Sequence, residues 1–410
     1  MKKLRGLVTI ILVAFLAIGM FGIASAAAEE MTIIKVAVIS PLSGGAGPWG
    51  QTGLTIYDAF MTVFNKEGFR VKGKLYGFKN VNYDSMNSPE GAAAATKRAV
   101  YEDKLKFIVG HWDATFTTTQ AIAMPQKVIM FTRNGNEAVK GGGGYDPVKM
   151  PYVVFATPAQ EMYIADVKAM TKANPNYKKI CLGDSTLGKG VGVEYIDAAL
   201  VKAGIRIHRE WWPEGTVDYS PYITRFNEAG CDYIMNAGNP VATMLLLKQR
   251  WALGFKHMKV GATGGMLSAK QYYQVAGKEA ANGLLTEDGD VTKIKKTKIN
   301  PIYVKQFKDT MALCTKNTGK PCTYTAFCAY GPTHLEILAQ AMQKAGSVDD
   351  PDKIMKAIRG GTFDTMVGKY TMSGAKTYGS PIVFGNPGLM SELKGGGPVY
   401  FGESPWEPVP

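Results

Sequence analysis

The chain has 410 residues, 46% of them hydrophobic, and carries a formal charge of +13. A chain of this length usually needs more than one hydrophobic core, so we expect two globular domains. The lysines are scattered except at Lys293, Lys295, Lys296 and Lys298, a cluster that favours a solvated loop over a docking patch. Export, which the first segment of the chain indicates, argues against nucleic acid as a partner.

The first segment has the layout of a secretory signal. Three basic residues within the first five precede an apolar stretch from Gly6 to Ile23. Small residues then offer cleavage sites up to Ala28, so we expect residues 1–28 to be a signal peptide and the mature protein to be soluble and periplasmic. An uncleaved anchor is the alternative, because the stretch approaches the roughly 17 residues that span a bilayer. No cysteine follows the stretch, so we expect no lipid anchor.

After this segment, short apolar runs alternate with segments of helical period. This alternation is typical of parallel sheets covered by helices on both faces, and it occurs in two successive blocks. The first block predicts strands at 33–39, 74–82, 107–109 and 128–131, and helices at 51–65, 91–101 and 118–124. The second predicts strands at 152–155, 179–183, 205–211, 233–237 and 258–261, and helices at 159–172, 191–203, 219–229 and 241–253. The fold class is therefore α/β, with two doubly wound, Rossmann-like lobes.

The last third of the chain follows a different pattern. Residues 301–313, 324–345 and 351–358 are mainly helical in pattern, and 367–372 reads as a short strand. These elements are too few for a third α/β domain, so they must complete the two blocks. Residues 380–410 are rich in Gly and Pro, and we expect them to wrap a surface rather than build a core.

The five cysteines allow disulfides in an oxidising compartment. Cys314 and Cys322 bracket a short polar segment, so we predict that they pair, which would contribute about 2–3 kcal/mol. Cys181 and Cys231 lie at or beside predicted strands and are expected to pack as small hydrophobic residues. The absence of a CxxC motif excludes a zinc ribbon or a redox motif.

Ligands of open parallel sheets bind beyond the carboxyl ends of the strands, so the loops there are the candidate sites. The first loop, residues 40–50, combines glycines with Trp49, which either faces a ligand or packs between loop and helix. The second, residues 110–119, carries hydroxyls that cap a helix or bind a carboxylate. The third, residues 132–136, favours a turn, and Arg133 adds a positive charge that suits an acidic ligand if it points inward.

Catalytic signatures are absent from the sequence. There is no GxSxG, HExxH or GxxxxGK[ST] motif, and the four histidines (His111, His208, His257 and His334) are far apart in the chain. We therefore expect no enzyme, no metal site and no cofactor. An exported enzyme and a sensor module that needs a separate signalling partner are the alternatives to a binding protein.

Several segments, taken in order, carry a family resemblance: residues 34–44, 83–84 with 88–90, 107–111 and 187–190. Together they resemble the extracytoplasmic solute-binding proteins of the leucine/isoleucine/valine-type ABC importers. The resemblance runs from about Ile34 to Met372 and implies the type I periplasmic binding protein fold, in which three crossovers join two lobes. We place the crossovers near residues 153–158, 284–291 and 368–372.

The resemblance also implies a division of the chain and a mode of action. The N-terminal lobe would comprise residues 29–153 and 286–367, and the C-terminal lobe residues 154–285 and 368–410. The lobes of such proteins close on a small ligand by a hinge motion and then dock on the membrane permease of an ABC importer. We expect this chain to act in that way, as a monomer.

Carried over position by position, the resemblance implies substrate-binding residues in both lobes: Trp49, Asp113, Ala114, Thr115, Asn134, Gly135, Asn136, Leu187, Asn239 and Thr263. Two departures bear on the ligand. Leu187 stands where the family has an aromatic residue. No Asp or Glu occurs from Val260 to Lys278, where amino-acid binders of the family carry an acid for the α-ammonium.

An unpaired ammonium in a closed cleft would cost several kcal/mol. Either Asp113 takes that role, or the ligand is a carboxylate without an amino group, aliphatic or aromatic. Family membership favours a branched-chain or other hydrophobic amino acid, and the missing acid, Trp49 and Arg133 favour the second class. Both hypotheses stay open at this point.

Overall fold

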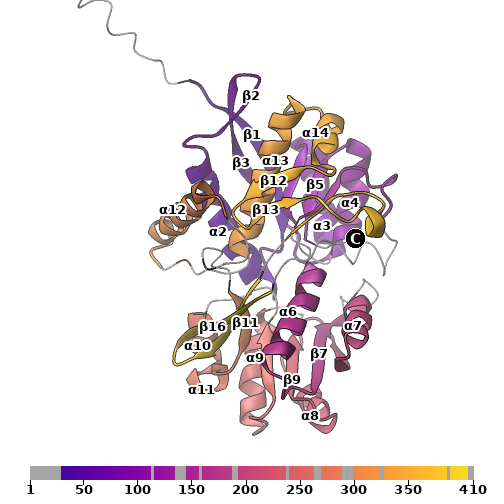
Figure 1. Ribbon diagram of the computed structural model, residues 1–410, viewed down its shortest axis with the longest axis vertical. Coiled ribbons are helices and arrows are strands. Elements are labelled where there is room, and N and C mark those ends of the chain that lie inside the picture. The colour runs from indigo at the N-terminus through magenta and orange to yellow at the C-terminus, as the bar shows by residue number, and fades with distance from the viewer. Residues whose placement is uncertain are drawn as a thin grey trace, which may run out of the picture.

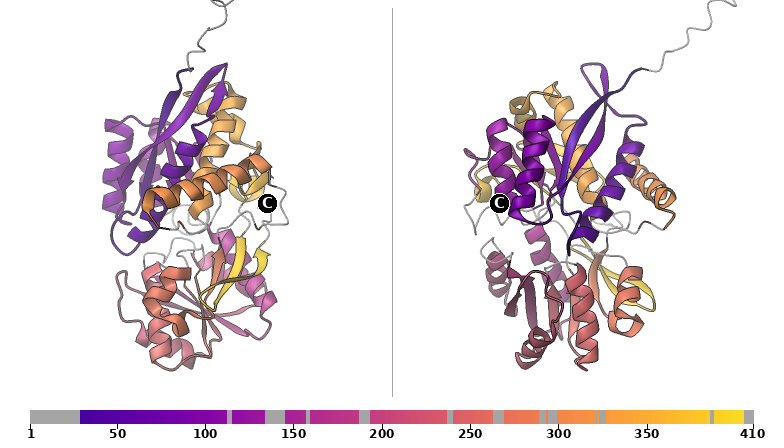
Figure 2. Two further views of the ribbon diagram at one scale, coloured as in Figure 1. Left: turned by 90° about the vertical axis from the view of Figure 1, so that its left-hand side faces the viewer. Right: turned by 180° about the vertical axis from the view of Figure 1, so that it is seen from behind.

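The protein consists of two α/β lobes, one above the other along the long axis of the computed structural model (Figure 1). A seven-stranded sheet forms the centre of each lobe, and helices cover both faces of the sheets (Figure 2). The structure describes residues 29–111, 115–133, 145–156, 159–186, 193–236, 240–262, 269–288, 293, 299–320, 322, 327–385 and 388–404.

The upper lobe is built on a sheet with the strand order β14-β6-β5-β4-β1-β3-β2. All neighbouring strands are parallel except β2 and β3. Runs of β-branched and aromatic residues make these strands, because both faces of the sheet are buried. The strands are β1 (Thr32–Ser40), β2 (Phe69–Val71), β3 (Lys74–Asp84), β4 (Phe107–His111), β5 (Ile129–Thr132), β6 (Val153–Ala156) and β14 (Val383–Phe384).

Two helical layers enclose this sheet. Helix α2 packs against α12 and α13 on one side, and α3 packs against α4 on the other. The Ser88 hydroxyl accepts a hydrogen bond from the Gly91 N–H (3.1 Å), which is the helix start that the sequence indicates. The helices are α2 (Gly47–Phe64), α3 (Pro89–Lys97), α4 (Phe116–Ala123), α12 (Pro301–Thr318), α13 (Phe327–Ala345), α14 (Pro351–Ile358) and α15 (Ala375–Tyr378), with a small sheet of β12 (Thr362–Thr365) and β13 (Gly368–Thr371).

The lower lobe has the strand order β16-β15-β11-β10-β9-β7-β8. Its sheet is parallel from β8 to β11, and β15 and β16 extend it as an antiparallel ribbon. The strands are β7 (Lys179–Ser185), β8 (Arg206–Trp212), β9 (Tyr233–Asn236), β10 (Lys259–Ala262), β11 (Leu285–Asp288), β15 (Gly388–Lys394) and β16 (Gly397–Ser404). The helices are α6 (Ala159–Ala173), α7 (Val193–Lys202), α8 (Ser220–Glu228), α9 (Pro240–Ala252), α10 (Ala269–Ala276) and α11 (Lys278–Ala281).

The third crossover and the tail differ from the sequence expectation. Residues 368–385 belong to the upper lobe, because β14 pairs with β6 and Val367, Met372 and Val383 lie in the upper core. The chain passes to the lower lobe only between β14 and β15. The expected C-terminal segment from residue 368 is therefore wrong, and so is the expectation that residues 380–410 merely wrap a surface. Alternating apolar positions such as Leu389 and Leu393, both buried, make a strand of the Gly-rich tail.

Two disulfides join parts of the chain. Cys314, in the last part of α12, pairs with Cys322 just beyond the end of this helix, as expected from the sequence. Cys181 and Cys231 also pair, which corrects the expectation that they pack as separate hydrophobic residues. The reason is that β7 and β9 are neighbours in the lower sheet, so that the two Cα atoms lie 5.8 Å apart, within the usual range for a disulfide.

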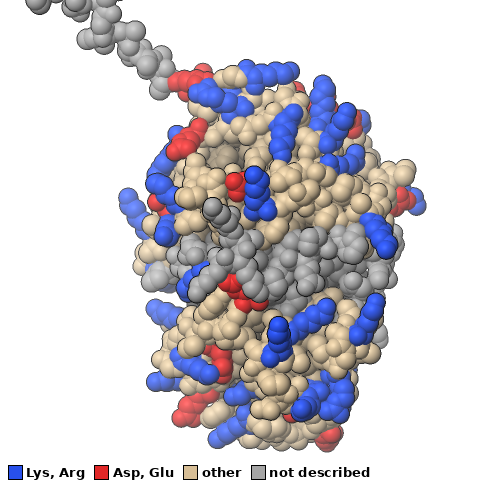
Figure 3. Space-filling view, viewed as in Figure 1, with Lys and Arg blue, Asp and Glu red and all other residues tan. Residues whose placement is uncertain are grey.

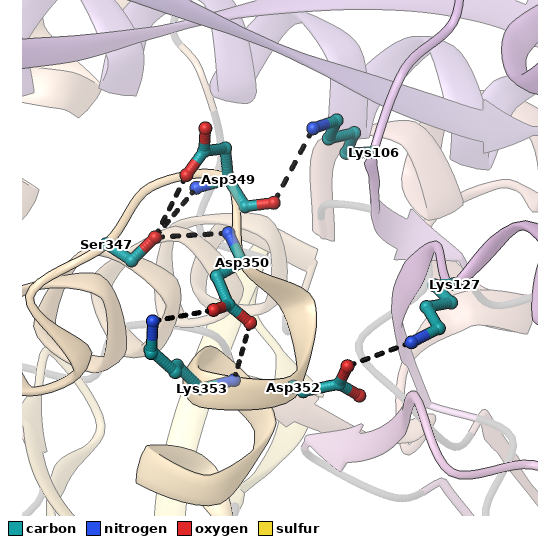
Figure 4. Close-up of polar contacts among 7 residues, drawn as sticks. All are labelled: Lys106, Lys127, Ser347, Asp349, Asp350, Asp352 and Lys353. Carbon is teal, nitrogen blue, oxygen red and sulfur yellow. Dashed lines mark hydrogen bonds and ion pairs between the residues drawn. The ribbon is translucent and has the colours of Figure 1, made fainter.

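Polar contacts hold α14 against the edge of the upper lobe (Figure 4). Asp350 caps this helix by accepting the Lys353 N–H (3.1 Å). Lys127, just before β5, forms an ion pair of 2.9 Å with Asp352, and Tyr152 donates to the same carboxylate (2.6 Å). Because the side chains of Lys127 and Asp352 are largely exposed, we assign their ion pair a role in orienting α14 rather than a large share of stability.

The surface shows no single charged region on the face drawn in Figure 3. Lys and Arg side chains there are spread over both lobes, in agreement with their scatter along the sequence. Among the described residues, no helix has both the length and the hydropathy that a membrane crossing would need.

Candidate functional site

A cavity of about 290 Å³ lies where loops of the two lobes meet. The upper lobe contributes the loop after β1 and the turn after β3, and the lower lobe contributes the loop after β8 and the first turn of α9. These segments follow the carboxyl ends of strands, where open parallel sheets bind ligands. The lining residues are Ser43, Gly44, Gly45, Ala46, Met86, Asn87, Glu214, Gly215, Thr216, Val217 and Val241.

The carboxylate of Asp84 fixes the upper wall of this cavity. Its Oδ1 accepts the N–H groups of Leu42 and Met86, each at 2.8 Å, and so ties the loop after β1 to the turn after β3. Burial raises the pKa of Asp84, but these hydrogen bonds and those from Ser43 outweigh it and leave the pKa below its ordinary value. Gly44 and Gly45 of the loop at residues 40–50, which the sequence predicts as a candidate site, line the cavity opposite the lower lobe.

Helix α2 begins four residues earlier than the sequence predicts, at Gly47 rather than Gln51. Trp49 consequently lies in the first turn of a helix, with Pro48 beside it, and not in the preceding loop. The early start follows from Pro48, whose fixed φ suits the first turn of a helix. The description of Trp49 covers its backbone alone.

The ends of β4 and β5 form a second group of polar side chains at the same edge of the upper sheet. His111 Nδ1 lies 3.1 Å from the Thr132 hydroxyl, and the Arg133 N–H donates to the His111 carbonyl (3.1 Å). Arg133 is only 3% exposed, and Thr115, at the N-cap of α4, is 2% exposed. Two of the expected ligand residues, Thr115 and Arg133, thus lie at the carboxyl ends of neighbouring strands.

The other expected ligand residues lie outside the described part of the chain: Asp113, Ala114, Asn134, Gly135, Asn136, Leu187, Asn239 and Thr263. Their elements can still be placed. The lower-lobe strands β7, β9 and β10 end at Ser185, Asn236 and Ala262, shortly before the three expected lower-lobe residues. Because these strands are parallel neighbours, their carboxyl ends lie at one edge of the sheet.

Two acids of the lower lobe were missed by the sequence analysis. Glu214 lines the cavity from the loop after β8, and Asp184, 8% exposed, lies near the end of β7. Burial raises the pKa of Asp184 to about 6; the charge of Arg209 opposes this shift and that of Glu214 adds to it. A sequence signal exists, because Asp184 and Glu214 each follow a predicted strand, at the ends of which ligands of this fold class bind.

The described residues hold no group of three or more His, Cys, Asp or Glu side chains placed to bind a metal ion. The lining of the cavity instead combines glycines, apolar side chains, the polar side chains of Ser43, Asn87 and Thr216, and one carboxylate, that of Glu214. Such a lining can hold a small organic molecule by its polar groups and its apolar body.

Comparisons with known proteins agree with this architecture. A sequence profile of the family described as "Periplasmic binding protein" matches residues 33–382. The chain is 28% identical over 368 residues to the Leu/Ile/Val-binding protein homolog 3 of Brucella melitensis, covering 88% of this chain and 92% of that one. It is 23% identical over 341 residues to the Leu/Ile/Val-binding protein of Escherichia coli K12, covering 82% and 86%.

Solved structures share the fold. A leucine binding protein from Thermotoga maritima superposes with a TM-score of 0.69 at 20% identity, covering 90% of this chain and 98% of that one. A solute binding protein of an ABC transporter from Rhodopseudomonas palustris HaA2, in complex with p-hydroxybenzoic acid, gives 0.70 at 18% identity, covering 90% and 95%. The relatives and the fold are those of substrate-binding proteins and not of enzymes. The chain belongs to the periplasmic binding protein family.

Proposed function

We propose that this protein captures a small carboxylate-bearing solute between its lobes and delivers it to the membrane permease of an ABC importer. The observation that carries the proposal is the position of Arg133. Its side chain is 3% exposed and follows β5 directly, at the edge of the upper sheet where ligands of this fold class bind. A guanidinium keeps its charge when buried and matches the geometry of a carboxylate with two parallel hydrogen bonds.

We infer that the solute is an organic acid without an α-ammonium group. The stretch from Val260 to Lys278 contains no acid, and it includes the segment after β10 from which an acid would reach the cleft. A shared fold with a protein crystallised with p-hydroxybenzoic acid supports an aromatic acid as one form of this ligand.

A branched-chain amino acid is the second candidate. Relatives named as Leu/Ile/Val-binding proteins favour it, and so does Glu214, which supplies a carboxylate to the wall of the inter-lobe cavity. An ammonium group beside Glu214 would have the anionic neighbour that the segment after β10 lacks. The two candidates therefore differ in a single group of the ligand.

The proposed location is the periplasm. The basic, apolar and small-residue progression of residues 1–28 favours export, and two disulfides fit an oxidising compartment. The relatives of this family are periplasmic as well.

A thermal-shift screen with matched ligand pairs tests the proposal. L-leucine against 4-methylpentanoate isolates the ammonium group, and benzoate against benzamide isolates the carboxylate. A ligand present at one hundred times its Kd stabilises the folded state by about 2.7 kcal/mol, which is well within detection. We expect stabilisation by 4-methylpentanoate or benzoate and none by benzamide. Stabilisation by L-leucine alone selects the second candidate, and equal stabilisation by benzamide contradicts a carboxylate site.

Replacing Arg133 sharpens this test. Arg133→Gln should weaken binding of the active acid at least tenfold, because loss of one charge-assisted hydrogen bond costs about 1.5–3 kcal/mol. Arg133→Lys should retain part of the affinity, and the exposed Arg206→Gln in the lower lobe should retain all of it. Unchanged affinity in Arg133→Gln would remove this residue from the site.

A further inference from the structure

A buried histidine links two strand ends of the upper lobe that are far apart in the sequence. His334 lies in α13, fully buried, and its ring faces the upper sheet. The Gly110 N–H of β4 donates to Nδ1 of His334 (3.0 Å), and Nε2 lies 3.2 Å from the carbonyl oxygen of Ala156 at the end of β6. The ring also stacks on Phe131 of β5, the strand between those two, with centroids 5.5 Å apart.

These contacts define the tautomer of the ring. A backbone N–H only donates, so Nδ1 of His334 must be unprotonated, and the ring proton on Nε2 is donated to Ala156. Burial lowers the pKa of His334 to about 3, the charge of Arg133 contributes to this shift, and the hydrogen bond to Ala156 opposes it. The ring therefore stays neutral, with both hydrogen bonds in place, over the whole range in which the protein is expected to work.

The link to β4 is made at an irregular point of that strand. The pairing of β4 with β5 shifts register between Ile108 and His111, and Gly110 has a φ of +68°. A Cβ atom at Gly110 would lie 2.5 Å from the ring of Tyr57, so this position requires glycine. Bulges of this kind redirect the end of a strand and leave a backbone group without a partner in the sheet. Here that group is the Gly110 N–H, and Nδ1 of His334 accepts its hydrogen bond.

The two linked strand ends lead in different directions. Gly110 and His111 precede the segment in which Asp113, Ala114 and Thr115 are expected to hold the ligand. Ala156 is the last residue of β6 and precedes the crossover to α6 of the lower lobe. One imidazole thus connects the strand that leads to the ligand segment with the strand that leads to the other lobe.

We propose that His334 is a positioning residue that couples the redirected end of β4 to the inter-lobe crossover after β6. The proposal rests on the proposed function in one respect, namely that the segment after β4 holds the ligand. Through this ring, a displacement of Gly110 on ligand binding is carried to Ala156, so that ligand binding favours one arrangement of the two lobes.

Hydrogen exchange of the ligand-free protein tests the link directly. His334→Phe keeps a ring in the same space but removes both hydrogen bonds. We expect backbone amides of residues 107–119 and 153–161 to exchange about tenfold faster, while the rest of the upper lobe keeps its rates. Glu336→Leu serves as the matched control, because Glu336 is buried on the same helix and accepts from Met366 N–H (3.0 Å), away from β4 and β6.

Two shorter substitutions separate the halves of the link. His334→Asn places an amide oxygen near the position of Nδ1 and should keep the slow amide exchange of residues 107–119 only. His334→Gln places an amide N–H near the position of Nε2 and should keep the slow amide exchange of residues 153–161 only. If His334→Phe fails to fold, these two variants decide the question. Faster exchange spread evenly over the upper lobe, or the same pattern in the Asn and Gln variants, would overturn the coupling.

A second measurement keeps this proposal apart from the proposed function. Benzoate, 4-hydroxybenzoate and L-leucine are titrated into wild type, His334→Phe and Glu336→Leu. For any probe that binds wild type, we expect about tenfold weaker binding in His334→Phe and unchanged binding in Glu336→Leu. Equal affinities in all three proteins would contradict the coupling. If no probe binds wild type, the proposed ligand class fails, and the exchange pattern still decides the role of His334.

Discussion

The two lobes share a fold but hold their interiors together by different means. Among the described residues, the buried side chains of the upper lobe form one continuous cluster, whereas those of the lower lobe form three separate clusters. The upper lobe adds neutral polar links from a central helix, α13. The lower lobe has a disulfide, Cys181–Cys231, that closes 50 residues, whereas Cys314–Cys322 of the upper lobe closes 8. It also has Arg250, whose guanidinium donates to carbonyls of separate segments.

The difference follows from how each lobe is assembled. The helices α12, α13 and α14 return late in the chain to cover the upper sheet, so its core is closed by elements from both halves of the sequence. Among the described residues of that late part, the ribbon β15–β16 is what extends the lower sheet. A lobe with a smaller continuous core gains more from covalent and charged cross-links, because less apolar burial offsets its chain entropy.

Removal of the buried disulfide Cys181–Cys231 should lower the free energy of unfolding more than any other change considered below. Cys181→Ala with Cys231→Ala opens a loop of 50 residues, and loop-closure entropy predicts a loss of about 4 kcal/mol. Cys314→Ala with Cys322→Ala opens a loop of 8 residues and should cost about 2.5 kcal/mol. Denaturant unfolding of both variants measures the two losses. A larger loss for the second pair would contradict the greater dependence of the lower lobe on its cross-link.

The second largest loss of unfolding free energy is expected on replacing Arg250. Its guanidinium donates to the carbonyls of Met258 (2.6 Å), Lys256 (3.3 Å) and Ala280 (3.1 Å) and so joins α9 to α11 and to the turn before β10. Arg250→Met would leave these carbonyls without that donor, at a cost of about 3 kcal/mol. Arg250→Lys keeps one donor and should lose less. Equal stability of Arg250→Met and wild type in denaturant unfolding would show that packing alone holds these elements.

Replacing Asp184 in the lower lobe is expected to raise the free energy of unfolding, by a smaller amount. Its folded-state pKa of about 6 is above the ordinary value of 3.8 because the carboxyl is buried. The stability tied to the protonated form is complete below about pH 4 and is lost as the pH rises through 6. Asp184→Asn should therefore be more stable than wild type at pH 7, by on the order of 2 kcal/mol, and equal to it near pH 4. Thermal unfolding at both pH values measures this difference, and equal stability at pH 7 would contradict it.

The fold was predictable because most of its elements are local. The apolar run of residues 33–39 and the start signal at Ser88 and Pro89 specify a strand and a helix without reference to the rest of the chain. Pairings over long distances were not predictable in this way. The disulfide between Cys181 and Cys231 and the passage of residues 383–384 into the upper sheet depend on which strands become neighbours.

The candidate site was predictable in outline only. Thr115 and Arg133 lie where the reading of strand ends puts them, because parallel strands place their following loops at one edge. Glu214 and Asp184 do not follow from the family resemblance, because the lower-lobe positions that it implies are Leu187, Asn239 and Thr263. The link from His334 to Gly110 spans 224 residues of sequence, and no local pattern indicates it.

The smallest expected effect concerns Glu336, the buried carboxyl of the upper lobe. It is 1% exposed, and burial raises its pKa well above the ordinary value, while the Met366 N–H that it accepts opposes the shift and the charge of Asp364 adds to it. A carboxyl with a raised folded-state pKa stabilises the protein fully below its unfolded-state pKa, and this contribution falls as the pH rises. Glu336→Gln keeps the acceptor for Met366 and removes the titration.

Glu336→Gln should therefore unfold at a higher temperature than wild type at pH 8 and at the same temperature near pH 4. Each kcal/mol gained raises the midpoint by roughly 2–4 °C in a domain of about 150–250 residues, the size class of one lobe. We expect a gain on the order of 1 kcal/mol, because the Met366 N–H stabilises the charged carboxylate and offsets part of the cost of its burial. Hydrogen exchange should place the gain in α13 and β12. A variant that is less stable at pH 8 would mean that the charged form of Glu336 has a stabilising partner, and the contrast between the lobes would then lie in their cross-links and not in their buried acids.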